Sequence, residues 1–219
     1  INGVVNVPIY KKLLKYGAKG FISYSGDITD TPDNSDLENK ELRDVLRNKG
    51  IIPGVHMRTK TAIELLNDNP KEVTLELSQD EFTQTSHNVI SEIKGNIYPD
   101  EIITITAHYE SVEFSKGAYD NGAGSVLIMK LYEYFVNNTP KRTLKFIWCG
   151  SEERGLLGSK AYVNAQTEEE LKRIIFNINV DVAGTILGTE YASIMAEQAL
   201  VDYVDYISNE ISFPIVTRQ

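Results

Sequence analysis

The chain has 219 residues and a formal charge of −9, from 22 basic and 31 acidic residues. Its hydrophobic fraction of 42% and charged fraction of 24% are ordinary for a globular protein. No apolar run reaches the ~18 residues that a membrane-spanning helix needs, and no basic cluster indicates a nucleic-acid-binding face. We therefore expect no membrane segment in this chain and no DNA or RNA partner, and we predict no particular oligomeric state.

Residues 1–80 are expected to form a smaller α+β domain. Short apolar runs predict strands, and the runs between them predict helices. The expected strands are Val4–Ile9, Gly20–Tyr24, Ile51–Val55 and Val73–Leu77, and the expected helices are Lys11–Tyr16 and Thr61–Asn67. The stretch Asp27–Asn39 is rich in Asp, Asn, Ser, Thr and Pro, which predicts a surface loop.

Residues 81–219 have the pattern of an α/β domain, which becomes clear from about Thr85. The expected strands are Asn88–Ile93, Ile102–Ala107, Leu144–Cys149, Ile178–Val182 and Ala192–Ala196, and the expected helices are Gly122–Asn137, Leu156–Ala165, Glu168–Arg173 and Val201–Ile211. Apolar strands that alternate with helices predict a mostly parallel central sheet flanked by helices.

One histidine and four carboxylates fall at or just after the ends of successive predicted strands. They are His108, Asp120, Glu152, Glu153 and Asp181. In parallel α/β folds, active residues gather where loops leave the carboxyl ends of the strands. Carboxylates that converge there repel one another unless a cation lies among them. Imidazole with carboxylates suits zinc, with cobalt or manganese as possible substitutes.

Each of these residues also has a purely structural interpretation. A histidine at a strand end can be a satisfied polar residue, and a Glu-Glu pair can be solvated surface. Asp120 followed by Asn-Gly can be a turn that leads into a helix. Recurrence at every strand end favours the metal interpretation. His56 and His87 are expected to be satisfied or exposed polar residues, and the single cysteine, Cys149, is expected to be a buried, inert thiol.

Four motifs around these residues resemble the consecutive motifs of the M28 zinc aminopeptidases, in the family's order. They are AHYES (107–111), GAYDNGAG (117–124), GSEERGLLGSKAYV (150–163) and NINVDVAG (177–184). The match covers about Thr85 to Gly184. It implies a zinc exopeptidase fold that takes peptide substrates and holds two zinc ions in a complete site. It also implies a secreted or cell-surface location.

The resemblance also implies a role for each residue. His108 would bind one zinc ion and Asp181 the same ion, Asp120 would bridge both ions, and Glu153 would bind the second. Glu152 would be the general base that acts on a metal-bound water to hydrolyse the N-terminal peptide bond. A non-proline cis peptide bond is implied after Asp120.

Two departures from the family pattern matter. The family has His-x-Asp at its first motif, where this chain has His108-Tyr109-Glu110, so Glu110 would have to hold the imidazole. The family's fifth metal ligand is a histidine well after the fourth motif, and this sequence stops at Gln219 without one. We therefore expect the natural chain to extend beyond both ends. The chain as given should bind the second metal poorly or not at all and should be inactive alone.

The N-terminal part resembles a protease-associated domain, an insertion found in some members of this family. The resemblance rests on VVNVPIYKKLLKYGAKGFISYS (4–25) and IIPGVHMRTKTAIELL (51–66). Such a domain would shape the substrate cleft or serve as a scaffold.

Alternative functions stay open on the sequence. A carboxypeptidase or dipeptidase could use the same scaffold, and a glutaminyl-cyclase-like transferase is a further possibility. A non-catalytic receptor-like ectodomain could keep the fold without metals, although the retained set of five candidate residues argues against it.

Overall fold

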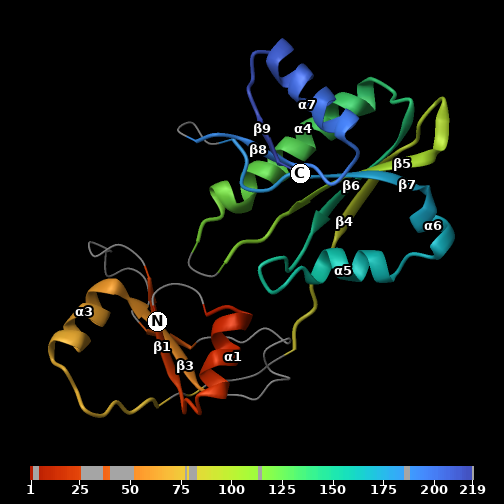
Figure 1. Ribbon diagram of the computed structural model, residues 1–219. Helices are drawn as coiled ribbons and strands as arrows, with labels where there is room; N and C mark the ends of the chain where they lie inside the picture. Colours follow the sequence, from red (N-terminus) through yellow and green to blue (C-terminus); the bar gives the residue numbers. More distant parts are fainter. Residues whose placement is uncertain are drawn as a thin grey trace. The chain divides into compact units, whose positions relative to one another are not determined.

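The computed structural model describes Ile1 and residues 5–25, 37–39, 52–76, 78, 83–112, 115–184 and 188–218, with the backbone alone at 37–39. The chain divides into two compact units, Ile1–Gln84 and Thr85–Gln219 (Figure 1). In the part of the chain that is described, every helix is too short or too polar to cross a bilayer.

The described residues of the first unit form a three-stranded sheet and two helices. The strands β1 (Phe21–Ser25) and β3 (Gly54–Arg58) pair in parallel, and β2 (Leu37–Asn39) pairs antiparallel with β3. The helices are α1 (Val7–Lys15) and α3 (Thr59–Asn67).

Aromatic packing forms the core of this unit. Tyr10 and Phe21 are buried and pack edge to face, with ring centroids 6.2 Å apart. The Tyr10 hydroxyl accepts a hydrogen bond from the Ile52 amide at 3.1 Å, so this buried polar group is satisfied.

The predicted strand Val4–Ile9 is wrong, because α1 begins at Val7; Val4 itself lies outside the described residues. The Asn6 side chain accepts a hydrogen bond from the Ile9 amide and caps the helix, and Pro8 suits a first helical turn. These local signals outweigh the β-branched composition of the segment.

Other elements predicted for this unit have different bounds in the structure or lie outside the described residues. The third strand is Gly54–Arg58 rather than Ile51–Val55, and Ile51 is not described. Residues 73–76 form no strand, and Leu77 lies outside the described residues. Most of the predicted loop Asp27–Asn39 also lies outside them, but its last three residues form β2.

The second unit is built on a four-stranded sheet with the order β4-β6-β5-β7. The strands are β4 (Val89–Ile93), β5 (Tyr98–His108), β6 (Arg142–Cys149) and β7 (Ile174–Asn179). The central strand β5 pairs in parallel with β6 and β7, and β4 pairs antiparallel with β6. The sheet is therefore mostly parallel, as the alternation of strands and helices predicted.

Four α-helices, the short π-helix η1 (Ala118–Gly122) that carries Asp120, and a small second sheet make up the rest of the described residues of this unit. The helices are α4 (Ala123–Asn137), α5 (Leu157–Asn164), α6 (Glu168–Arg173) and α7 (Gln198–Glu210), and β8 (Tyr191–Ser193) pairs in parallel with β9 (Val216–Arg218). Thr167 and Glu170 form a reciprocal capping box at the start of α6.

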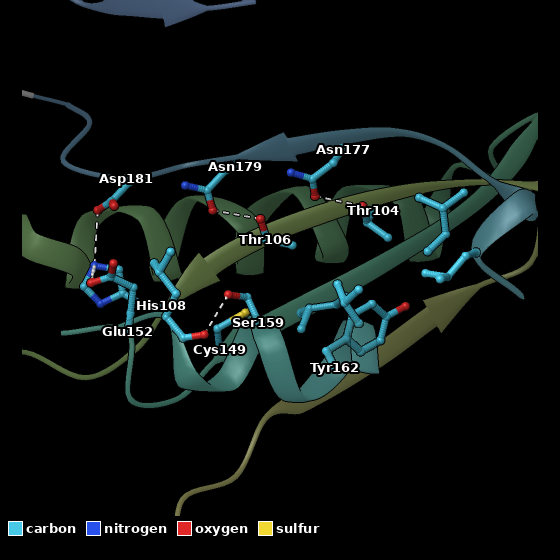
Figure 2. Close-up of a pocket in the computed structure, with 15 residues that line it drawn as sticks. Thr104, Thr106, His108, Cys149, Glu152, Ser159, Tyr162, Asn177, Asn179 and Asp181 are labelled. Carbon is cyan, nitrogen blue, oxygen red and sulfur yellow. Dashed lines mark hydrogen bonds and ion pairs between the residues drawn. The ribbon is translucent and has the colours of Figure 1, made fainter. Parts of the chain in front are cut away.

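The core of the second unit lies between α4 and one face of the sheet. Its buried members are Ile105, Ala107, Ile128, Leu144, Phe146 and Trp148. The neighbouring residues on β6, Ile147 and Cys149, point to the opposite face, toward α5. Helices thus cover both faces of the sheet, with α4 and α5 on opposite sides (Figure 2).

The predicted buried strand Ile178–Val182 is wrong in its position and burial. The strand β7 begins four residues earlier, directly after α6, and ends at Asn179. It stands at the end of the strand order and is largely exposed, with Ile178 43% accessible. An apolar run of this kind does not show whether a neighbour covers it. The prediction therefore placed Asp181 inside a strand, whereas it lies in the loop after β7.

Replacement of Ile128 by Ala tests the core. Ile128 lies on the buried face of α4 and is fully buried, so the change should lower the free energy of unfolding by about 2–5 kcal/mol. Urea unfolding can be followed by the fluorescence of Trp148, the only tryptophan in the chain. The control V126A lies on the same helix at a residue 57% exposed, and should change stability by less than about 0.5 kcal/mol. An equal loss in both variants would contradict the assigned buried face of α4.

Candidate metal centre

The imidazole of His108 is the centre of the candidate site. His108 ends β5 and is 4% exposed. Its Nδ1 lies 2.9 Å from the backbone carbonyl oxygen of Glu110. A carbonyl only accepts hydrogen bonds, so Nδ1 must carry the proton. A neutral His108 therefore has its lone pair on Nε2, which is the atom that a metal would bind.

Three carboxylates surround this Nε2 atom. Asp120 Oδ1 lies 3.0 Å away, Asp181 Oδ1 3.2 Å away and Glu152 Oε2 3.9 Å away. Figure 2 shows Asp181 and Glu152 beside the His108 ring. The structure thus brings together four of the five residues that the sequence singled out.

The inner group of these residues fits a zinc ion. The ligand atoms of His108, Asp120 and Asp181 lie within 4.8 Å of one another. Ligands held at about 2.1 Å in a tetrahedron are about 3.4 Å apart, close to the 3.0 and 3.2 Å seen from Nε2. Nitrogen and carboxylate oxygen are also donors that zinc accepts.

A buried asparagine positions the loop that carries Asp120. The Asp120–Asn121 peptide bond is cis, as the family resemblance implies. Asn121 is 1% exposed, and its Nδ2 donates to the Val180 carbonyl at 2.9 Å. Its Oδ1 accepts from the Gly124 amide in the first turn of α4 at 3.0 Å. One side chain therefore ties the loop of Asp120 to the segment just before Asp181.

The start of α4 is also fixed to the end of β5. Ser125 Oγ donates to the His108 carbonyl at 2.8 Å, and Trp148 Nε1 donates to the Ser125 carbonyl at 3.2 Å. A Cβ at Gly124 would collide with the Asn121 side chain and the Val180 carbonyl, so the close approach requires glycine there.

Glu110 joins the first motif to the Glu152–Glu153 turn. Its Oε1 accepts from the Glu153 amide at 3.0 Å. Its Oε2 is buried 3.8 Å from His108 Nδ1 and has no hydrogen-bond partner in the described structure. The imidazole is thus held by the Glu110 main chain, while the carboxylate holds the turn.

The structure does not bring the Glu153 carboxylate into this group. The two candidate metal groups found among the described residues are His108–Asp120–Asp181 and His108–Glu110–Glu152. The assignment of Glu153 as a ligand of a second ion stays a prediction. The turn that carries it is tightly bent, since Ser151 has a φ of 56°.

Electrostatics at the site follow from burial and from mutual repulsion. Burial opposes the charged form of His108, but its hydrogen bond to Glu110 and the charges of Asp181, Glu110 and Glu152 raise its pKa above the ordinary value. Burial raises the pKa of Glu152, and the charges of Glu153, Asp181 and Glu110 raise it further against the opposing effect of His108. Burial first, then the charges of Glu110 and Glu152, raise the pKa of the Cys149 thiol, in keeping with an inert residue.

The candidate site opens into a cavity of about 460 Å³ between the sheet and α5. His108, Glu152 and Asp181 stand at one end of it (Figure 2). Thr104, Thr106, Asn177 and Asn179 line its sheet side, and Tyr162 of α5 faces them.

The two other histidines lie outside this group. His56 in the first unit has Nδ1 2.9 Å from Ser23 Oγ and Nε2 3.0 Å from Ser25 Oγ. His87 is exposed, and its carbonyl accepts from the Tyr109 hydroxyl. Their interpretation as satisfied or exposed polar residues is confirmed.

Comparison with known proteins gives the family. The profile of peptidase family M28 matches residues 88–212, more than half of the chain. The chain belongs to peptidase family M28.

Curated M28 relatives carry aminopeptidase names. Aminopeptidase YwaD of Bacillus subtilis (strain 168) is 38% identical over 171 residues, covering 77% of this chain and 35% of the relative. A probable leucine aminopeptidase 2 of Trichophyton verrucosum is 33% identical over 126 residues, 58% of this chain and 25% of the relative. The chain thus spans about a third or less of the length of these relatives.

Solved structures of aminopeptidases share the fold. The chain is similar to BSAP, a zinc aminopeptidase from Bacillus subtilis, with a TM-score of 0.69 and 26% identity over 99% of this chain and 53% of that one. It is also similar to an aminopeptidase from Aneurinibacillus sp. strain AM-1, with a TM-score of 0.67 and 25% identity over 100% and 55% of the two chains. An Acidobacteriales bacterium glutaminyl cyclase matches with a TM-score of 0.51 and 17% identity over 60% of this chain and 50% of that one, which shows the fold alone.

Sequence reasoning overlooked the neutral residues that position the candidate metal ligands. Asn121 and Ser125 bind main-chain carbonyls of Val180 and His108. An asparagine just before the glycine that opens a predicted helix is a helix-cap signal. That signal could have identified Asn121, whereas nothing local marks Ser125.

Replacement of Asn121 by Ala should destabilise the second unit. The change removes the acceptor of the Gly124 amide in the first turn of α4 and leaves the Val180 carbonyl without this partner, which should cost about 2–4 kcal/mol of unfolding free energy. Urea unfolding followed by Trp148 fluorescence measures the loss. The control N137A removes an exposed hydrogen bond at the other end of α4, and should cost less than about 0.5 kcal/mol. Similar losses in the two variants would show that Asn121 is not a tie between these segments.

Proposed function

We propose that this chain carries the catalytic core of a zinc aminopeptidase that removes N-terminal residues from peptides. The observation that carries the proposal is the convergence of His108, Asp120 and Asp181 at zinc-like spacing with Glu152 beside them. The aminopeptidase names of the curated relatives favour this activity over the carboxypeptidase or dipeptidase alternative. The retained acidic set argues against a metal-free receptor.

Two zinc ions would occupy the complete site. His108 and Asp181 would bind the first ion, Asp120 would bridge, and Glu153 would bind the second. The half-exposed Asp120 side chain, 50% accessible, supports the bridging role because one of its oxygens faces His108 and the carboxylate remains reachable.

Zinc, when bound, would polarise the scissile carbonyl and make a water molecule more acidic. Glu152 would take a proton from that water and donate it to the leaving amine. Its side chain is 29% exposed and lies beside the His108 group without belonging to its inner part, which suits a base rather than a ligand. Glu110 supports this role, since its bond to the Glu153 amide restrains the turn that carries Glu152.

The first unit would act as a protease-associated domain that shapes the substrate cleft or serves as a scaffold. Its parallel pair β1–β3 and its two helices are compatible with the α+β character expected from the sequence. A secreted or cell-surface location is proposed from the family resemblance alone.

Peptidase activity of the full natural protein tests the proposal. After reconstitution with zinc, we expect release of N-terminal residues from a panel of aminoacyl and peptide substrates, followed by mass spectrometry. Peptides with a blocked N-terminus should be spared, and a chelator should abolish the activity. Release from the C-terminus instead would establish the carboxypeptidase alternative, and no cleavage across the panel would refute the proposal.

The variant E152Q tests the base. An amide cannot accept the proton, so turnover should fall by at least about 100-fold while zinc content, measured by elemental analysis, stays at the wild-type level. The control E133Q changes an exposed glutamate of α4 that pairs with Lys130, and should leave both quantities unchanged. Wild-type turnover in E152Q would show that another group is the base.

A further inference from the structure

Two side-chain hydrogen bonds of the same kind join β5 to β7 next to the candidate metal centre. Thr104 Oγ1 donates to Asn177 Oδ1 and Thr106 Oγ1 donates to Asn179 Oδ1, both at 2.8 Å. We refer to these four residues as the Thr–Asn ladder. Figure 2 shows the ladder on the face of the sheet that also carries His108 and Asp181.

The ladder and the candidate metal ligands lie on the same face of the sheet. Alternate residues of a strand share one face, so Thr104 and Thr106 are followed on β5 by His108. On β7, Asn177 and Asn179 share one face, and Asp181 lies two residues beyond the end of this strand, 3.2 Å from His108 Nε2. The next backbone bond after the ladder, from the Val180 amide to the Thr106 carbonyl at 2.8 Å, continues the pairing toward the site.

The register between β5 and β7 is not uniform along the strands. Ile102 pairs with Ile174, but Ile103 pairs with Phe176, so one residue of β7 is extra before the ladder begins. A shift of one residue moves every side chain of a strand to the other face. Beyond this irregularity, β7 must keep its register with β5 for the Asp181 side chain to face His108.

Apolar packing contributes little to that register. The described residues of β7 are mostly exposed, and the strand stands at the end of the sheet order. Pairing that is not tied to a buried apolar face is prone to slip. Specific side-chain bonds between the strands supply the missing restraint.

We infer that Thr106 and Asn179 are positioning residues for the zinc site, because their hydrogen bond holds Asp181 in register with His108. The inference rests on the proposed zinc site. The other pair, Thr104 and Asn177, has the same chemistry and the same bond length but lies two residues farther from the candidate ligands along each strand. It therefore serves as an internal control for a purely structural role.

Matched threonine-to-valine variants in the full chain separate the two roles. T106V should weaken zinc binding about tenfold, at the low end of the effect of losing a residue that orients a ligand. T104V should leave the zinc dissociation constant unchanged. Thr104 is the more deeply buried of the two, so T104V should cost at least as much stability. Zinc affinity is measured by competition with a chromophoric chelator, and stability by Trp148 fluorescence in urea.

Two further sets of variants make the test independent of one substitution. T106S keeps the hydroxyl and should retain wild-type zinc affinity. N179A and N177A should repeat the contrast from the opposite strand, which also covers the case in which T106V does not fold. The double variant T106V/N179A should bind zinc no more weakly than T106V, since the bond is already lost.

The outcomes are distinct. Two results would overturn the inference while leaving the zinc site intact. One is equal weakening of zinc binding in the Thr106/Asn179 variants and the Thr104/Asn177 variants, and the other is no weakening in either set. A wild-type chain that binds no zinc would overturn both the zinc site and the inference. Weakening confined to T106V and N179A would establish the positioning role.

Discussion

The candidate site depends on holding several carboxylates around one imidazole nitrogen against their mutual repulsion. Asp120, Asp181 and Glu152 all approach His108 Nε2 within 3.9 Å. Such a cluster is stable only where the main chain prevents its members from moving apart or a cation neutralises them. Burial opposes the charged form of His108, but its hydrogen bond to Glu110 and the charges of the nearby carboxylates raise its pKa.

Neutral hydrogen bonds to the main chain provide the restraint. Asn121 fixes the loop of Asp120 to the Val180 carbonyl, and Ser125 fixes the start of α4 to the His108 carbonyl. These bonds add no charge that would compete with a metal. The candidate ligands are thereby placed close together by the fold itself, so a cation bound there would relieve repulsion instead of first ordering the chain. A ligand that binds the native state alone also stabilises it.

The positions of strand ends were the part of the site that sequence reasoning could reach. His108 ends a strand as expected, because a β-branched run up to Ala107 defines the strand clearly. The position of Asp181 was harder, since the apolar run before it does not distinguish a buried strand from an exposed strand at the end of a sheet. The predicted strand Val4–Ile9 was wrong for another reason, because the Asn6 cap and Pro8 outweighed composition. Hydrogen bonds between distant segments, such as those of Asn121 and the Thr–Asn ladder, require the register of the sheet and could not be found from local patterns.

Glu110 departs from the family pattern at the His-x-Glu motif. The position keeps an acid, but its carboxylate binds a different partner. An acid at this position is expected to hold the imidazole, yet His108 Nδ1 is held by the Glu110 carbonyl oxygen at 2.9 Å. The carboxylate is then free to accept the Glu153 amide at 3.0 Å. The additional methylene of glutamate gives the side chain the reach for that second partner. Glu110 therefore links the strand that carries His108 to the turn that carries Glu152, and the orientation of the imidazole no longer depends on the carboxylate alone.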